Sequence, residues 1–133
     1  MIDHLSTYAT DFESTRAFYI AVLPPLGYEL QEEMEIPDGD ASKRRACAFG
    51  PDGKPLFWII EAQQTYTPRH FAFAAPDRAA VAAFHTAGLA AGGKDFGEPG
   101  LRPVYHEHYY GSFLLDPDDN NVEAVCHTPA AGA

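Results

Sequence analysis

The sequence predicts an α+β fold built from two tandem βαβββ units. The first reason is an internal repeat, because the second half of the chain matches the first at an offset of 66 residues. Residues of the same type recur at this offset: His4 and His70, Asp11 and Asp77, Phe18 and Phe84, Leu23 and Leu89, Gly27 and Gly93. The second reason is that each half has the same order of signals, a strand and a helix followed by extended runs. A chain of 133 residues also suits one compact domain.

The first half begins with a short strand signal at residues 2–9. Thr10 and Glu13 then have the spacing of a capping box. The helix that they open has apolar residues at helical spacing, namely Phe12, Phe18, Tyr19, Val22 and Leu23, and prolines with a glycine end it at 24–27. Three extended runs follow, with Pro-Asp-Gly turns between them, at residues 28–34, 44–49 and 56–61.

The second half repeats this order with a looser end. Residues 70–75 are typical of a strand, and Pro76 and Asp77 open a helix that Gly92 and Gly93 close. The remaining segments are a short strand at 94–96, a long loop at 97–108, and strands at 110–115 and 121–127. We therefore expect one domain over residues 1–128, with units at about 1–62 and 68–128 and a tail at 129–133.

The net charge and the absence of targeting signals argue against nucleic acid or a membrane as a partner. The formal net charge is −10 and the pI is about 4.8, so the average field repels nucleic acid and anionic membranes. No apolar run approaches the length of a membrane helix, and the first residues lack the pattern of a signal peptide. Cys47 and Cys126 are therefore expected to be reduced thiols in a cytoplasmic protein.

Three side chains are candidate metal ligands. His4 and His70 hold equivalent positions in the first strand of each half, and a two-fold repeat would place them facing one another across a shared cavity. Glu123 lies inside an apolar strand, where a carboxylate is costly to bury without a partner. Two histidines and one carboxylate leave open positions on a metal for substrate or water. The alternatives are ordinary hydrogen-bonded or exposed histidines and a glutamate that faces water.

The order of these motifs resembles the glyoxalase/bleomycin-resistance/dioxygenase superfamily, also called vicinal oxygen chelate proteins. The resemblance rests on the paired units, the first-strand His4, the segment 70–75 and the closing segment 115–123. It implies that the two units form a curled mixed sheet around a cleft, each unit as a half-barrel, and that the cleft holds one divalent metal ion (Fe, Mn, Zn or Ni). It further implies that the ligands are His4, His70 and Glu123, and that the protein is a homodimer, in which a site is sometimes built from two chains.

One departure separates the sequence from the glyoxalase I-like branch. The 66-residue offset carries Glu123 back onto Phe57, where that branch has a fourth ligand, a glutamate. Glu61 has the same parity as Phe57 but lies four residues further along the strand, too far to replace it. The resemblance then implies three protein ligands, as in the extradiol-dioxygenase and fosfomycin-resistance branches.

Candidate substrate and catalytic residues lie mainly in the segment before the strand at 110–115. Arg102 is suited to bind a carboxylate or phosphate, Tyr105 and Tyr109 offer aromatic contacts, and His106 or Tyr110 is suited to move a proton. Phe57 and Trp58 offer an apolar wall. The alternatives are a surface loop and a core strand.

The candidate ligands predict a metal-dependent enzyme, and the resemblance implies that a small oxygen-rich substrate chelates the metal through adjacent oxygens. Isomerisation or lyase chemistry, oxygenation and group transfer remain open. One alternative is a metal-free, bleomycin-resistance-like protein that binds a small molecule between aromatic walls. Another is a metal-binding domain with a regulatory or assembly role.

Overall fold

The computed structural model describes residues 2–39, 42–65 and 67–130. The helices and strands within these residues are, in chain order, β1 (Leu5–Ala9), α1 (Phe12–Val22), the 3-10 helix η1 (Pro24–Leu26), β2 (Glu29–Pro37), β3 (Lys43–Gly50), β4 (Phe57–Glu61), β5 (His70–Ala74), α2 (Arg78–Ala90), β6 (Lys94–Leu101), β7 (Tyr110–Leu115) and β8 (Asn121–Cys126). This order is two successive βαβββ units, which confirms the predicted fold class.

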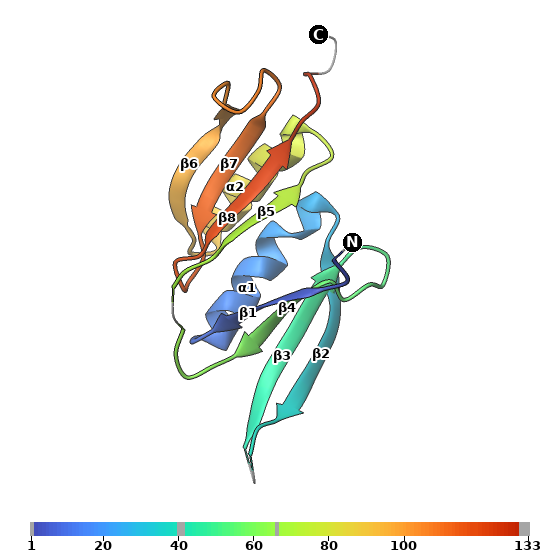
Figure 1. Cartoon of the computed structure of the whole chain (residues 1–133), viewed down its shortest axis with the longest axis vertical. Helices are drawn as coiled ribbons and strands as arrows, with labels where there is room; N and C mark the ends of the chain where they lie inside the picture. The colour runs from blue at the N-terminus through green and yellow to red at the C-terminus, as the bar shows by residue number, and fades with distance from the viewer. Residues whose placement is uncertain (1, 40–41, 66, 131–133) are drawn as a thin grey trace.

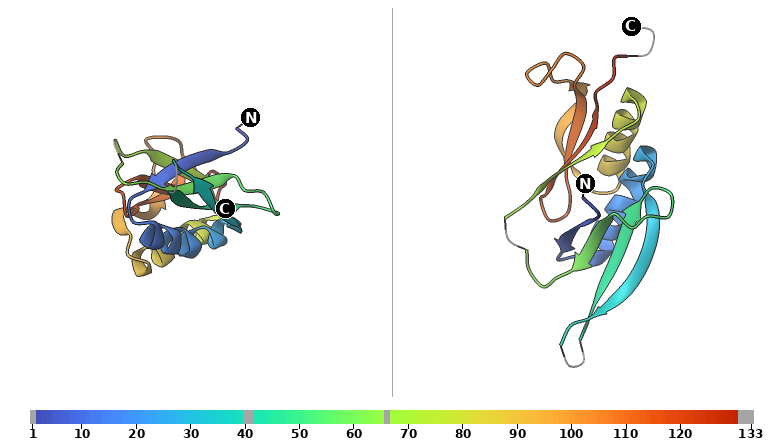
Figure 2. Two further views of the ribbon diagram at one scale, coloured as in Figure 1. Left: turned by 90° about the horizontal axis from the view of Figure 1, so that it is seen from below. Right: turned by 45° about the vertical axis from the view of Figure 1, so that its right-hand side comes forward.

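Each unit forms its own four-stranded mixed sheet. The strand orders are β1-β4-β3-β2 and β5-β8-β7-β6, so that the first strand of each unit is an edge strand parallel to the last. Figure 1 shows the two sheets placed one after the other along the long axis of the molecule. Both helices lie on the same side of the molecule (Figure 2), and α1 packs against α2. No helix of the described residues lies on the opposite face of each sheet (Figure 2), and we call this face the open face.

Aromatic side chains from both units hold the halves together on the helix side. The Phe57 ring lies 5.4 Å from Phe71 and 5.2 Å from Phe73, and Tyr28 lies 5.5 Å from Phe73, measured between ring centroids. These contacts have the edge-to-face geometry that aromatic pairs prefer. The relative placement of the two sheets therefore follows from a shared aromatic core.

A buried polar contact also crosses the boundary between the halves. The Tyr19 hydroxyl in α1 donates a 2.7 Å hydrogen bond to Asp116, which lies in the turn between β7 and β8. Asn120 and the backbone N–H groups of Asp118 and Asn120 donate three further hydrogen bonds to the same carboxylate. Burial nevertheless raises the pKa of Asp116. This network anchors the second half to the first helix.

The start of α1 differs from the predicted capping box. Asp11, rather than Thr10, caps the helix, and its carboxylate accepts a hydrogen bond from the backbone N–H of Ser14. The Thr10 hydroxyl instead donates a 2.6 Å hydrogen bond to the Asp118 carboxylate. Glu13 forms an ion pair with Arg45. Thr10 and Glu13 are therefore used in tertiary contacts that a local pattern does not reveal.

Strand β6 is longer than the predicted run of three residues. It continues to Leu101 through the sequence Gly97-Glu98-Pro99-Gly100, with register shifts at both glycines. Glycine and proline normally demote a strand prediction. They are tolerated here because β6 is the edge of its sheet, where bulges are common.

Alternation along the strands decides which side chains reach the open faces. Phe57 and Ile59 are fully buried beneath the helices, so Trp58 and Ile60 point to the open face of the first sheet. Tyr8 pairs with Ile60 in the parallel register and therefore shares that face. In the second sheet the same argument places His70 and Glu123 on the open face, whereas Phe71 and Val122 point to the core.

The pairing register corrects the sequence equivalence of Glu123. Leu5 pairs with Phe57 in the first unit, and its counterpart Phe71 pairs with Val122 in the second. Val122 is thus the structural counterpart of Phe57, and Glu123 is the counterpart of Trp58. The offset in the last strand is 65 residues rather than 66, because the connections before it differ by one residue. The first unit therefore has a tryptophan at the position of the candidate carboxylate ligand.

We predict that Cys47 is inert to alkylation in the folded protein. Cys47 is free and fully buried, and burial raises the pKa of its thiol to about 11. The reactive thiolate is therefore scarce in the folded state at about pH 8.5, the ordinary thiol pKa. Iodoacetamide labelling read by mass spectrometry should modify Cys47 only after unfolding in denaturant. Labelling of native Cys47 at the rate of the denatured protein would contradict the prediction.

Within the described residues, no helix is long and apolar enough to cross a membrane.

Candidate metal centre

Glu123 is a buried carboxylate in the middle of β8. Its side chain is only 3% exposed, although its neighbours along the strand are the apolar residues Val122 and Ala124. Burying an ionised carboxylate without a partner costs on the order of several kcal/mol in desolvation. Gly111 on β7 leaves room for it, because a Cβ there would lie 3.3 Å from Oε2. The strand geometry therefore builds a small polar site inside an apolar sheet.

His70 lies on one side of this carboxylate. It begins β5, and its Nε2 lies 3.1 Å from Glu123 Oε1. Its Nδ1 lies 3.0 Å from the backbone carbonyl of Asn121. A carbonyl only accepts, so Nδ1 carries a proton and donates it. In a neutral imidazole, Nε2 is then the atom with the free lone pair.

The facing atoms of His70 and Glu123 are therefore two acceptors when the imidazole is neutral. A lone pair on Nε2 directed at an ionised carboxylate oxygen 3.1 Å away is unfavourable unless a proton or a cation lies with them. The side chain of His70 is half exposed, which leaves one side of the pair open to solvent. The donor set thus fits a divalent metal, since a neutral imidazole nitrogen and a carboxylate oxygen are ordinary ligands of such ions.

Tyr109 lies on the other side of the carboxylate. Its hydroxyl donates a hydrogen bond to Glu123 Oε2, the oxygen that does not face His70. Burial, followed by the neighbouring Glu123, raises the pKa of Tyr109 well above its usual value. The phenol therefore remains protonated and acts as a donor at neutral pH. Oε1 is left as the oxygen available to a cation.

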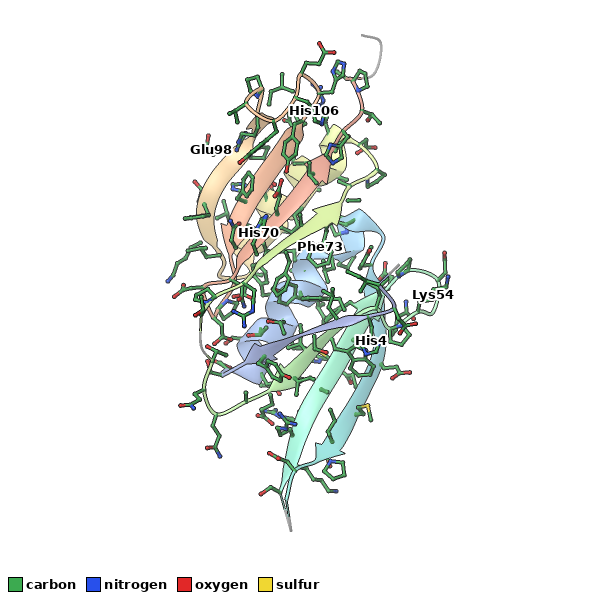
Figure 3. All side chains as sticks on the ribbon, viewed as in Figure 1. His4, Lys54, His70, Phe73, Glu98 and His106 are labelled. Atoms are coloured by element: carbon green, nitrogen blue, oxygen red, sulfur yellow. The ribbon has the colours of Figure 1, made fainter. Side chains whose placement is uncertain are left out.

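His4 lies far from this pair. It immediately precedes β1 on the first sheet, whereas His70 and Glu123 belong to the second sheet, and Figure 3 shows His4 and His70 on different halves of the molecule. The imidazole is exposed, and its Nδ1 lies 2.6 Å from the Asp3 carboxylate. Since a carboxylate accepts, Nδ1–H donates, and in a neutral imidazole Nε2 is again the atom with the free lone pair. Both candidate histidines thus have Nδ1 engaged, the arrangement that orients a ligand histidine in metal sites.

The chain brings together two of the three predicted ligands. Across residues 2–39, 42–65 and 67–130, no three His, Cys, Asp or Glu side chains form a group able to hold a metal ion. A cavity of about 520 Å³ lies between β1, the segments 62–65 and 67–69, and the turn before β8. His4, His70 and Glu123 are not among its lining residues. Within one chain, His4 and His70 therefore do not face one another across a shared cavity.

The two residues predicted to move protons lie away from His70. The Tyr110 ring points to the helix side of β7, where the Arg78 guanidinium lies 5.0 Å from its centroid. His106 lies in the segment between β6 and β7, at the end of the second half remote from His4 (Figure 3). Its Nε2 lies 2.8 Å from Nδ1 of His127, rather than near Glu123. Their neighbour Tyr109, predicted as a substrate contact, is the residue that reaches the carboxylate.

The predicted substrate residues divide between the core and the open faces. Phe57 is fully buried in the aromatic core, whereas Trp58 reaches the open face of the first sheet. The Arg102 guanidinium lies 5.4 Å from the centroid of the Phe113 ring, and the centroid of the His70 ring lies 6.5 Å from the same point. Tyr105 packs against Tyr109, with ring centroids 4.8 Å apart. A guanidinium and three aromatic rings thus surround the approach to His70 and Glu123.

Sequence reasoning missed His127 and the role of Phe113. His127 follows β8 and has the same parity as Glu123, so period-two alternation was a usable signal for it. Phe113 pairs directly with Glu123 across β7 and β8. That contact depends on the strand register, which the sequence pattern does not specify.

The comparisons with known proteins identify the family. The family model described as the Glyoxalase/Bleomycin resistance protein/Dioxygenase superfamily matches residues 1–124. The chain belongs to this superfamily. A search of curated proteins gave no match.

Solved structures of superfamily members share the fold. A glyoxalase/bleomycin resistance protein from Albidiferax ferrireducens is 26% identical, with a TM-score of 0.70 over 95% of this chain and 98% of its own. A glyoxalase I variant from Zea mays is 20% identical, with a TM-score of 0.69 over 93% of this chain and 46% of its own. A variant of the fosfomycin resistance protein FosX from Listeria monocytogenes, in complex with Mn(II) and 1S,2S-dihydroxypropylphosphonic acid, is 21% identical. Its TM-score is 0.65, over 96% of this chain and 93% of its own.

Proposed function

We propose that this protein is a divalent-metal-dependent enzyme that acts on a small oxygen-rich molecule. The metal would be held by His70 and Glu123 of one chain and by His4 of a second copy. The substrate would chelate the metal through adjacent oxygens, in a lyase or isomerase, dioxygenase or transferase reaction. Fe, Mn, Zn and Ni are the candidate ions.

The observation that carries the proposal is the geometry around Glu123. A buried carboxylate oxygen faces the free Nε2 of His70 at 3.1 Å, and the Nδ1 of that histidine is already committed to a backbone carbonyl. This pair is stable only with a positive charge between or beside its atoms. A divalent cation supplies that charge and accepts both atoms as ligands.

The open faces support a site shared between two chains. Tyr8 and Met34 on the first sheet are 48% and 47% exposed, and Trp58 and Ile60 lie between them in the sheet order. Exposed large apolar residues on one sheet face mark an interaction surface. Packing this face against the second sheet of another copy would bring His4, with its free Nε2, toward His70 and Glu123. A homodimer with two-fold symmetry would contain two such sites.

The chain's own residues would orient the substrate next to this centre. Arg102 is placed to bind an anionic group, since its guanidinium lies over the Phe113 ring that also contacts His70. Trp58 of the partner subunit would supply an apolar wall. The bound cation would stabilise negative charge that develops on a chelated substrate oxygen. We also propose a reducing cytoplasmic location, which the two buried free thiols support.

We predict that two variants that each fail to bind metal regain metal binding when they are mixed. His4→Ala dimers and Glu123→Ala dimers would each lack a ligand in both sites. A heterodimer of the two would keep one complete site, built from His4 of one chain and His70 with Glu123 of the other. Random subunit exchange makes about half of the dimers mixed, so metal analysis should recover about one ion per four chains.

The matched control mixes His70→Ala with Glu123→Ala. Both substitutions lie on the same sheet, so no mixed dimer regains a complete site, and no metal should be recovered. Equal recovery in the two mixtures would contradict a shared site. Wild-type protein without any affinity for divalent ions would favour the metal-free binding protein instead.

A further inference from the structure

His106 and His127 form a hydrogen-bonded pair next to Tyr109. His106 Nδ1 accepts the backbone N–H of His108 at 3.1 Å, so it carries no proton. Its Nε2 is then the protonated nitrogen, and it donates to Nδ1 of His127 at 2.8 Å. His127 can accept there only if its own proton is on Nε2. Both imidazoles are therefore neutral in this arrangement.

The Tyr109 ring lies against both members of the pair. Its centroid is 5.5 Å from His106 and 5.2 Å from His127, with the ring planes close to perpendicular in each case. Tyr105 covers another side of the ring, at 4.8 Å. The hydroxyl is thereby directed at Glu123 Oε2. The imidazole pair and Tyr105 thus fix where the phenol points.

We propose that Tyr109 is a positioning residue for Glu123, and that the His106–His127 pair holds Tyr109 in place only while both imidazoles are neutral. The proposal rests on the proposed function, since it assigns to Glu123 the role of metal ligand. Tyr109 holds Oε2, so Oε1 is presented to the metal as a single-oxygen ligand beside His70. Outer-shell hydrogen bonds of this kind orient ligands and raise metal affinity.

Two hydrogen bonds hold the pair, and protonation of an imidazole removes one or the other of them. A proton on Nδ1 of His106 removes the acceptor for the His108 N–H, and a proton on Nδ1 of His127 sets two N–H groups against each other. Other charged groups are close: Glu107 pairs with His108 at 3.4 Å, and Arg102 acts on Tyr109. On β8 the neighbouring Cys126 thiol forms a hydrogen bond with the Thr128 hydroxyl. None of these groups offers an acceptor to the broken pair in the described structure.

The test measures Mn²⁺ affinity at two pH values, by the EPR signal of the free ion. At about pH 7.5, Tyr109→Phe should bind Mn²⁺ about tenfold more weakly than wild type. At about pH 5.5 the difference should shrink to about twofold, because protonation of either imidazole opens the pair in wild type. The readout is the ratio of the two affinities at each pH, so that any loss of binding common to both proteins cancels.

Two substitutions at one position separate hydrogen bonding from protonation. His127→Asn keeps an acceptor at the place of Nδ1 that does not protonate, so it should match wild type at about pH 7.5 and keep its advantage over Tyr109→Phe at about pH 5.5. His127→Phe removes the acceptor, so its Mn²⁺ affinity should match that of Tyr109→Phe at both pH values. His108→Gln is the control, since its backbone N–H remains and its side chain is not in the pair.

An affinity ratio that is the same at both pH values, or a Tyr109→Phe variant that binds as tightly as wild type, would overturn the proposal. A measurement on the metal-free protein keeps this failure distinct from failure of the proposed function. Histidine side-chain ¹⁵N NMR at about pH 7.5 should show His106 protonated on Nε2 and His127 accepting on Nδ1. Any other protonation pattern would overturn the pair even if no variant binds metal.

Discussion

Glu123→Gln should abolish stoichiometric metal binding while the protein remains folded. The substitution keeps the size of the side chain but replaces the anionic oxygen that faces His70 with a neutral group. Loss of a direct ligand costs more than the roughly 10- to 100-fold that loss of an outer-shell partner costs, so metal content should fall from about one ion per chain to near zero. Metal analysis after dialysis gives the readout.

The stability of the metal-free proteins provides the control for this prediction. Glu123 is buried, and removing an incompletely compensated buried charge is neutral or stabilising. Metal-free Glu123→Gln should therefore unfold at the same urea concentration as metal-free wild type, or at a higher one. Glu29→Gln on exposed β2 removes a charge elsewhere and should keep its metal. A Glu123→Gln protein that retains one ion per chain would refute the ligand assignment.

Asp116→Ala should strongly destabilise the protein, although Asp116 lies outside the metal centre. Four donors converge on its carboxylate, from Tyr19, Asn120 and two backbone N–H groups. Truncation leaves them buried without an acceptor, and each orphaned group costs about 1–3 kcal/mol. We expect the free energy of unfolding to fall by about 3–5 kcal/mol in urea titrations, as for the loss of one partner in a buried pair.

Tyr19→Phe separates one contact from the rest of the network. It removes the single hydroxyl that crosses from α1 and should cost about 1–2 kcal/mol. Glu29→Ala, which removes an exposed carboxylate, should change the free energy of unfolding by less than about 0.5 kcal/mol. Equal stabilities of Asp116→Ala and Glu29→Ala would show that the buried network does not hold the halves together.

The internal repeat carried most of the fold prediction. Matching residues such as Phe18 and Phe84 are buried on the two helices, and the same order of strands occurs in both units. The prediction was wrong in places where tertiary contacts override local patterns. Thr10 bonds to Asp118 across 108 residues, and β6 runs through a Gly-Glu-Pro-Gly segment because it is an edge strand. Neither effect is visible in a short window of sequence.

The candidate site was harder to predict because it depends on how the units are placed. The sequence pattern correctly placed Glu123 inside an apolar strand, and the structure shows that this strand lies next to the strand of His70. The pattern did not indicate that Phe57, Phe71 and Phe73 would join the units through their helix side. That packing leaves His4 on a separate open face. The offset of 66 also assigned Phe57 to the position that Trp58 occupies, since one residue of difference in a connection reverses the strand face.

Anomalous X-ray diffraction from crystals of the metal-loaded protein tests the central claim most directly. The account predicts one strong anomalous peak per chain, bound by His70 Nε2, Glu123 Oε1 and Nε2 of the partner's His4, at roughly 2.0–2.2 Å from each. A peak at other side chains, or an imidazolium His70 hydrogen-bonded to Glu123 with no ion in crystals soaked in Mn²⁺, Fe²⁺, Ni²⁺ and Zn²⁺, would contradict it.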